Sequence, residues 1–175
     1  HSVKELRSLG ISPDVLICRS NQELPKDEKN KIALFCSVPN DNVISMHDVD
    51  TVYSIPILLN KQKVDEIILN KLKVKTKKPN LNDWKRVVKA KLHPAKEVNV
   101  SFVGKYTELK DSYKSINEAL EHAGIQNKAK VNIDFVEAEE ITAKNVKRIL
   151  KNSDAILVPG GFGERGIEGM ITACK

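Results

Sequence analysis

Short apolar runs alternate with amphipathic stretches along the whole chain. In the first half, residues 14–18 are short, β-branched and apolar on both faces, which predicts a buried parallel strand, and residues 43–46 predict another short strand. The first amphipathic stretch opens on Ser2 and Glu5, which have the spacing of a capping box, and stops at Gly10. Helical spacing of apolar residues predicts helices over 2–9, 26–36, 54–59, 64–72 and 81–92.

The second half has a more regular pattern, and residues 93–97 before it form a plausible linker. Gly124 is expected to end one of its helices, and Thr142 is expected to cap the next. The pattern predicts strands over 98–103, 130–136 and 154–158, and helices over 109–122, 142–150 and 166–175. This βαβαβ order, followed by a loop and a helix, predicts an α/β fold with a doubly wound parallel sheet. Ligands bind such a sheet outside the carboxyl ends of its strands.

The most informative segment is 154–166, in which an apolar run stops at Pro159 and four glycines follow within seven residues. Backbone N–H groups in such a loop, before a helix, can hold an anion, a phosphate or a developing oxyanion. The alternative is a turn that needs glycine only for its positive φ angles.

The composition is that of a soluble globular protein: 41% of the 175 residues are hydrophobic and 30% are charged. No apolar run approaches the roughly 20 residues that span a bilayer, so we expect no membrane association. Cys18, Cys36 and Cys174 lie far apart, and the four histidines are scattered, so no metal site is expected. We interpret the cysteines as reduced thiols of a cytoplasmic protein. Cys174 lies well inside the last predicted helix and is not expected to be a nucleophile.

The net charge of +6 is concentrated in residues 61–97, which hold eleven lysines and one arginine against four acidic residues. Such a cluster could meet nucleic acid or an acidic partner. Because aromatic residues are scarce near Lys73–Lys78, a solvated basic loop is the more common case, and we expect no nucleic-acid partner.

Three groups of segments, taken in order, resemble the CTP synthase family over the whole chain. They are 1–6 (HSVKEL) with 14–20 (DVLICRS), 31–39 (KIALFCSVP) with 43–45 (VIS) and 48–50 (DVD), and 103–106 (VGKY) with 113–115 (YKS) and 155–166 (AILVPGGFGERG). The resemblance implies an enzyme in which an amidoligase domain of P-loop type phosphorylates UTP with ATP and Mg²⁺. A glutaminase domain supplies the ammonia that displaces the phosphate. Residues 1–92 would then be the end of the amidoligase domain, 93–97 a linker, and 98–175 the first βαβαβ part of a class I glutamine amidotransferase domain.

The resemblance also implies site residues in the second part of the chain. Gly160 and Gly161 would supply N–H groups to the acyl oxyanion, and Gly161 and Phe162 would contact glutamine. A GTP-activator region would include Lys105, Tyr106, Lys114, Arg165 and Glu168, for which ordinary surface charges are the alternative.

In the first part of the chain, the resemblance places UTP or the inhibitor CTP at Lys31, which would otherwise be a surface lysine. It places ATP at Arg19, His47, Asp48 and Val49. A salt bridge is the equal alternative for Arg19, and an ordinary strand-to-helix turn is the alternative for the other three.

Several parts of the family pattern have no counterpart in these 175 residues. They are the phosphate loop, the Mg²⁺ carboxylates and the Cys–His–Glu triad. We therefore expect the isolated chain to be inactive, and the intact protein to form a tetramer. The alternative function is a nucleotide-binding regulatory or filament module without turnover.

Overall fold

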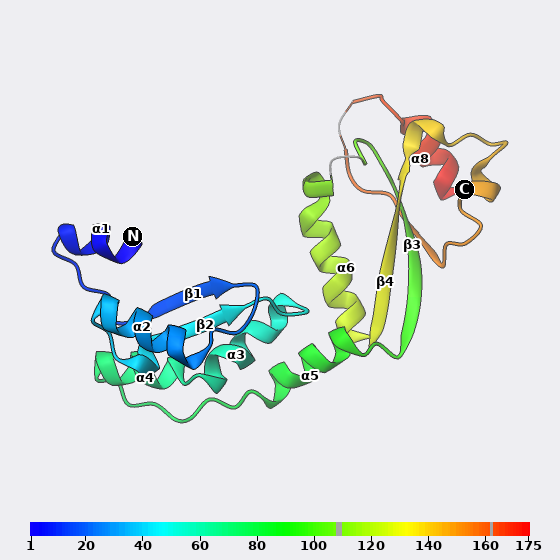
Figure 1. Ribbon diagram of the computed structural model, residues 1–175. Coiled ribbons are helices and arrows are strands. Elements are labelled where there is room, and N and C mark those ends of the chain that lie inside the picture. The colour runs from blue at the N-terminus through cyan, green and yellow to red at the C-terminus, as the bar shows by residue number, and fades with distance from the viewer. Residues whose placement is uncertain (108–109, 162) are drawn as a thin grey trace. The chain divides into compact units, whose positions relative to one another are not determined.

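The chain forms two compact units, residues 1–88 and 89–175, in a computed structural model that describes residues 1–107, 110–161 and 163–175. Each unit contains a parallel sheet with helical connections (Figure 1).

The first unit is built on a pair of parallel strands, β1 (Leu16–Ser20) and β2 (Val43–His47). Leu16 pairs with Val43 at one end of the ladder, and Ser20 pairs with His47 at the other. The other elements are α1 (Ser2–Ser8), α2 (Lys26–Cys36), η1 (Asn40–Asn42), η2 (Val52–Ser54), α3 (Ile55–Lys61), α4 (Val64–Leu72) and most of α5 (Asn82–Leu92), whose last four residues fall in the second unit. The five helices expected from apolar spacing are confirmed, with bounds that differ by at most two residues.

The core of the first unit lies between α2 and the strands. Ala33, Val38 and Val43 are buried, and Cys18 and Cys36 pack against them as free thiols. Burial raises the pKa of the Cys18 thiol, as does the neighbouring Cys36. The expectation that both faces of the first strand would be buried was wrong. Exposure alternates along β1, and the side chain of Ile17 is 56% exposed.

The side chain of Gln62 forms hydrogen bonds with the backbone of Ser45, the middle residue of β2, as a neighbouring strand would do. The Gln62 side chain accepts a hydrogen bond from the N–H of Ser45 and donates one to its carbonyl, both at 2.9 Å. Ser45 is only 2% exposed, so these bonds satisfy backbone groups that water does not reach.

The second unit has a three-stranded parallel sheet of order β4-β3-β5. Its strands are β3 (Lys96–Gly104), β4 (Ala129–Glu137) and β5 (Ala155–Leu157). The connections contain η3 (Lys110–Tyr113), α6 (Lys114–Gln126), η4 (Ala138–Glu140) and α7 (Val146–Ile149), and α8 (Ile167–Cys174) follows the last strand.

Neighbouring residues of β3 and β4 pack on opposite faces of this sheet. Phe102 pairs with Phe135 and packs against Tyr113, with ring centroids 5.2 and 4.5 Å away, respectively. Val103 pairs with Val136, and both belong to the cluster that includes Ala173 of α8. With two covered faces, the parallel sheet confirms the expected α/β fold.

Three helix-end predictions were wrong. At the first helix, His1 rather than Ser2 is the N-cap residue, and no side chain caps it. Gly124 lies inside α6, where a Cβ would come within 2.6 Å of the Ala129 carbonyl oxygen. Its role is therefore close packing against β4 rather than helix termination.

The third helix-end prediction that was wrong concerns Thr142. The helix expected from this residue onward is confined to α7, and the Asn145 side chain accepts a hydrogen bond from the Thr142 N–H. Asn145 also donates to the Glu140 carbonyl, so it organises this turn.

In the following strand, Ile156 is 44% exposed, because β5 pairs only with β3 among the described residues.

Candidate functional site

Three turns leave the carboxyl ends of β3, β4 and β5 and meet at one edge of the sheet. They comprise residues 105–107, residues 138–140, and residues 158–161 with 163–166, respectively. Their side chains form the hydrogen-bonded contacts described below, at the edge where a doubly wound sheet binds ligands.

Gly160 and Gly161 lie exposed in the third turn, and neither has a positive φ angle. A Cβ added to either residue would meet nothing within 4 Å. Among the described residues, no hydrogen bond engages the N–H of either glycine. The turn itself therefore does not explain why both positions are glycine, whereas close approach of a ligand to the backbone would. Phe162, the residue expected beside them, lies outside the described part of the chain.

Gly163 and Gly166 are the glycines that the turn geometry requires, with φ angles of +78° and +71°. Gly169, one turn into α8, is buried against η4, and a Cβ there would overlap the Ala138 carbonyl group. Glycine at this position allows α8 to lie directly on the turn that follows β4.

Lys105 connects the first turn to the glycine loop. Its Nζ donates a hydrogen bond to the Gly163 carbonyl at 2.9 Å, and the residue is 7% exposed. The Tyr113 hydroxyl donates to the Lys105 carbonyl, so this turn is also held from the α6 side. A buried lysine gives this edge of the sheet a positive charge in a partly desolvated environment.

Arg165 and Tyr106 also meet here, since the guanidinium carbon lies 4.8 Å from the centre of the Tyr106 ring. Arg165 donates two hydrogen bonds to Glu139, from Nε at 2.8 Å and from Nη2 at 2.9 Å. These bonds lower the pKa of the Glu139 carboxyl, with burial opposing, and raise that of Arg165. The planar guanidinium thus joins the turns after all three strands.

Sequence reasoning missed Glu137 and Glu139, the acidic partners of this cluster. Glu137 accepts hydrogen bonds from the N–H and Oγ1 of Thr107, at 2.7 and 3.0 Å. The available signal was position, because Glu137 is the last residue of β4 and Glu139 lies in the turn that follows it at the ligand edge.

Lys114 and Glu168 are not joined to this cluster by any contact among the described residues. Lys114 is the exposed first residue of α6, and Glu168 is exposed in the first turn of α8. A hollow of about 210 Å³ in the second unit lies elsewhere, against Ala129 at the amino end of β4 and against Glu121 of α6.

In the first unit, Arg19 and Asp48 lie together at the carboxyl ends of β1 and β2. Arg19 Nη2 is 2.6 Å from Asp48 Oδ1, and both side chains are more than half exposed. The pair is therefore the salt bridge that we held open as an alternative for Arg19. His47 is the last residue of β2, and its Nδ1 is buried without a hydrogen-bond partner among the described residues. Val49 is half-buried beside them.

Lys31 is exposed on α2, and none of the described contacts joins it to the Arg19–Asp48 pair. Its assignment to UTP therefore stays a prediction.

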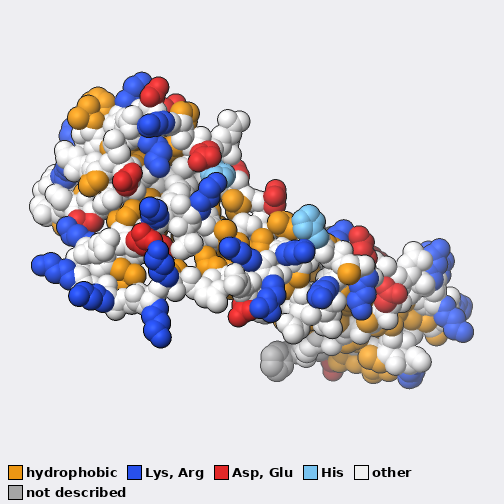
Figure 2. All heavy atoms as spheres, turned by 90° about the horizontal axis from the view of Figure 1, so that it is seen from below, with side chains coloured by type: hydrophobic (Ala, Val, Ile, Leu, Met, Phe, Trp, Pro, Cys, Tyr) orange, Lys and Arg blue, Asp and Glu red, His pale blue; other side chains and the backbone are white. Residues whose placement is uncertain are grey.

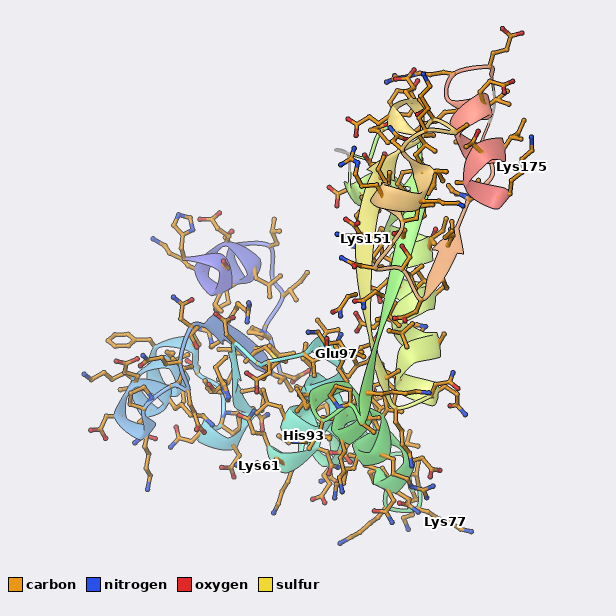
Figure 3. All side chains as sticks on the ribbon, turned by 90° about the vertical axis from the view of Figure 1, so that its right-hand side faces the viewer. Lys61, Lys77, His93, Glu97, Lys151 and Lys175 are labelled. Atoms are coloured by element: carbon orange, nitrogen blue, oxygen red, sulfur yellow. The ribbon has the colours of Figure 1, made fainter. Side chains whose placement is uncertain are left out.

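The central part of the basic cluster, residues 71–80, lies at the surface of the first unit. Every residue from 71 to 80 is exposed, and Lys and Arg side chains stand out in the space-filling view (Figure 2). Figure 3 shows the Lys77 side chain reaching away from the ribbon.

Trp84, the single tryptophan, is half-buried and donates to the Tyr53 carbonyl at 2.7 Å. This contact makes Trp84 a packing residue.

Within the described ranges, no group of three or more His, Cys, Asp or Glu side chains could hold a metal ion. No helix in the same ranges is long and apolar enough to cross a bilayer.

Comparison with known proteins agrees with the two units. Residues 1–74 match the family model described as CTP synthase N-terminus, and residues 108–175 match that of class-I glutamine amidotransferases. A protein named CTP synthase from Pelagibacter ubique (strain HTCC1062) is 52% identical over 176 residues, which cover 100% of this chain and 33% of the relative. The chain belongs to the CTP synthase family. Another CTP synthase, from Hydrogenobaculum sp. (strain Y04AAS1), is 51% identical over 99% of this chain and 32% of its own length.

The chain spans about a third of the length of these CTP synthase relatives. The family resemblance drawn from the ordered motifs is therefore confirmed, and the two halves of the chain match two different parts of the family's architecture.

Proposed function

We propose that the protein containing this chain makes CTP by ATP-dependent amination of UTP, with ammonia released from glutamine. Residues 1–92 would complete the amidoligase domain, 93–97 would link the domains, and 98–175 would begin the glutaminase domain. The matches to a CTP synthase N-terminus and to a glutamine amidotransferase support this assignment.

One observation carries the glutaminase part: the exposed backbone of Gly160 and Gly161 at the carboxyl edge of the sheet. Their N–H groups have no described partner, and the space beside each Cα is open. When water attacks the amide of glutamine, or a nucleophile does so, negative charge develops on the carbonyl oxygen. Fixed N–H groups would stabilise that charge in the transition state, and one such donor contributes roughly 3–4 kcal/mol. Phe162 and Gly161 would contact the bound glutamine.

The nucleotide part is supported by the exposed ends of β1 and β2. Arg19, His47, Asp48 and Val49 would bind ATP, since a planar guanidinium can stack on adenine and a carboxylate can accept a hydrogen bond from the adenine amino group. Lys31 would contact UTP or the inhibitor CTP. We assign no Mg²⁺ ligand to the described residues, because they hold no suitable carboxylate cluster.

Regulation and assembly complete the proposal. GTP would act as an activator through Lys105, Tyr106, Lys114, Arg165 and Glu168, a mainly cationic set suited to a triphosphate. The protein would be cytoplasmic and tetrameric, with no nucleic-acid or membrane partner. The isolated 175-residue chain would not turn over glutamine or UTP.

Alanine substitutions in the glycine loop of the full-length protein test the proposal. Because a Cβ at Gly161 would meet nothing within 4 Å, Gly161→Ala should change the free energy of unfolding by less than about 0.5 kcal/mol. Glutamine hydrolysis should nevertheless fall by about 10- to 100-fold, because the new methyl group would occupy the space of the substrate. Gly160→Ala should behave similarly.

The comparison variant is Gly10→Ala in the first unit, where an added Cβ also meets nothing within 4 Å. Because the φ angle of Gly10 is +79°, alanine is strained there, so this variant should lose about 1 kcal/mol or more of stability. It should leave glutamine hydrolysis unchanged. Wild-type hydrolysis in the Gly160→Ala and Gly161→Ala variants would contradict the assignment of this loop.

A further inference from the structure

Glu137 joins two of the turns at the carboxyl edge of the sheet. It is the last residue of β4, and one carboxylate oxygen, Oε1, accepts both donors of Thr107. Thr107 is only 8% exposed, so these bonds are shielded from water. Hydrogen bonds to a charged acceptor in such surroundings are stronger than neutral, solvated ones.

The turn held by Glu137 is the one that carries Lys105. Between Lys105 and Thr107 lies Tyr106, whose φ angle of +56° is unfavourable for a residue with a side chain. Such a conformation persists only where the surrounding structure enforces it. The bonds from Glu137 on one side and from Tyr113 on the other supply that restraint.

Lys105 links this turn to the glycine loop through a hydrogen bond. Its Nζ donates to the Gly163 carbonyl, whereas Gly160 and Gly161 make no described hydrogen bond through their own N–H groups. These two glycines also have no side chains to pack. Their orientation therefore depends on contacts elsewhere in the loop, of which the Lys105–Gly163 bond is one.

We infer that Glu137 is a positioning residue for glutamine hydrolysis, acting through Thr107 and Lys105 on the N–H groups of the glycine loop. This inference rests on the proposed function. Glu137 would not touch glutamine, so its removal should leave KM nearly unchanged and lower kcat. The reason is that the N–H groups would act on charge that develops only in the transition state.

The test uses the full-length protein and separates positioning from folding. For Glu137→Ala, we expect kcat for glutamine hydrolysis to fall about tenfold while KM changes less than about threefold. Glu137→Gln keeps a carbonyl oxygen for the two Thr107 donors and should stay within about threefold of the wild-type kcat. The control is Glu140→Gln, an exposed neighbour whose side chain makes no described contact, and it should have no effect.

Urea denaturation of the same preparations, followed by circular dichroism, shows whether the second unit of each variant is folded under the assay conditions. CTP formation from added ammonium salt bypasses glutamine hydrolysis, so Glu137→Ala should retain it. A wild-type kcat in Glu137→Ala would overturn the inference. Equal loss of glutamine- and ammonia-dependent synthesis would also overturn it, because the residue would then be generally structural. A wild-type protein that makes CTP from ammonia but hydrolyses no glutamine would instead overturn the proposed function, and the inference with it.

Discussion

Gly169 lies so close to Ala138 that a Cβ on Gly169 would overlap the Ala138 carbonyl group. This contact seats α8 directly on η4, the turn at the end of β4. The glycine loop runs into α8, so the same contact fixes one end of that loop. Gly169 thus affects both the packing of α8 and the position of the glycine loop, although it has no functional side chain.

Gly169→Ala should therefore destabilise the second unit. The added methyl group would force α8 away from a backbone carbonyl, which cannot rotate aside as a side chain could. Overpacking of this kind costs about 1–3 kcal/mol, and here the loss should lie at or above the upper end. Urea denaturation followed by circular dichroism measures it. Gly160→Ala is the matched control, because a Cβ there meets nothing within 4 Å, and a similar loss in both variants would contradict the packing account.

Gln62→Ala should destabilise the first unit. The substitution would leave the N–H and carbonyl of Ser45 without their partners at a position that is 2% exposed. We expect a loss of about 1–3 kcal/mol in the free energy of unfolding. Because Trp84 is the single tryptophan and lies in the first unit, its fluorescence reports this transition separately. Gln22→Ala, an exposed glutamine, serves as the control, and equal stability of the two variants would refute the role of Gln62.

Arg19→Ala tests the ATP assignment independently of folding. The Arg19–Asp48 salt bridge is exposed, and such pairs contribute about 0–1 kcal/mol, so the melting temperature should hardly change. Affinity of the full-length protein for ATP should fall about tenfold if the guanidinium stacks on adenine. Arg86→Ala removes a similarly exposed pair, with Asp83 at 2.8 Å, and should leave ATP affinity intact. Equal effects of the two substitutions would indicate a non-specific charge effect.

The Glu139 carboxyl should titrate below the ordinary glutamate pKa of about 4.3. Arg165 lowers this pKa, chiefly through its hydrogen bonds. The pair should therefore stabilise the fold fully above the ordinary pKa, and its contribution should be lost as the pH falls through the lowered value. Carboxyl-carbon NMR of the chain measures the titration midpoint directly. Arg165→Gln should raise the midpoint, and an unchanged midpoint would show that the ion pair does not form in solution.

Local sequence pattern predicted most elements, because apolar spacing and glycine or proline positions report the environment of each segment. The bounds of α2, Lys26–Cys36, were predicted without error. The pattern was less reliable at helix ends. Glycine is typical of a helix stop, yet α6 continues past Gly124 to Gln126, and the missing side chain leaves room for Ala129 of β4 beside the helix backbone. The spacing of apolar residues along a helix carries no information about such a contact with a different element.

The candidate site was predictable only in part. The order of strands and helices places the turns after β3, β4 and β5 at one edge, whereas Lys105, Tyr106 and Arg165 were assigned to a common region by the family resemblance. Their acidic partners could not be paired in advance. Glu137 binds a residue 30 positions earlier, and Arg165 binds a residue 26 positions earlier. Such pairs depend on the register between strands, which the polar residues at strand ends do not specify.

By itself, the sequence determined the alternation of strands and helices, the family, and the glycine loop at a strand end. Each of these follows from residues that lie close together along the chain or in a fixed order. Tertiary structure decided which glycines permit close packing and which face open space. It also decided that Glu137 and Glu139 hold the turns of the site, since only the folded backbone brings these distant residues within hydrogen-bonding distance.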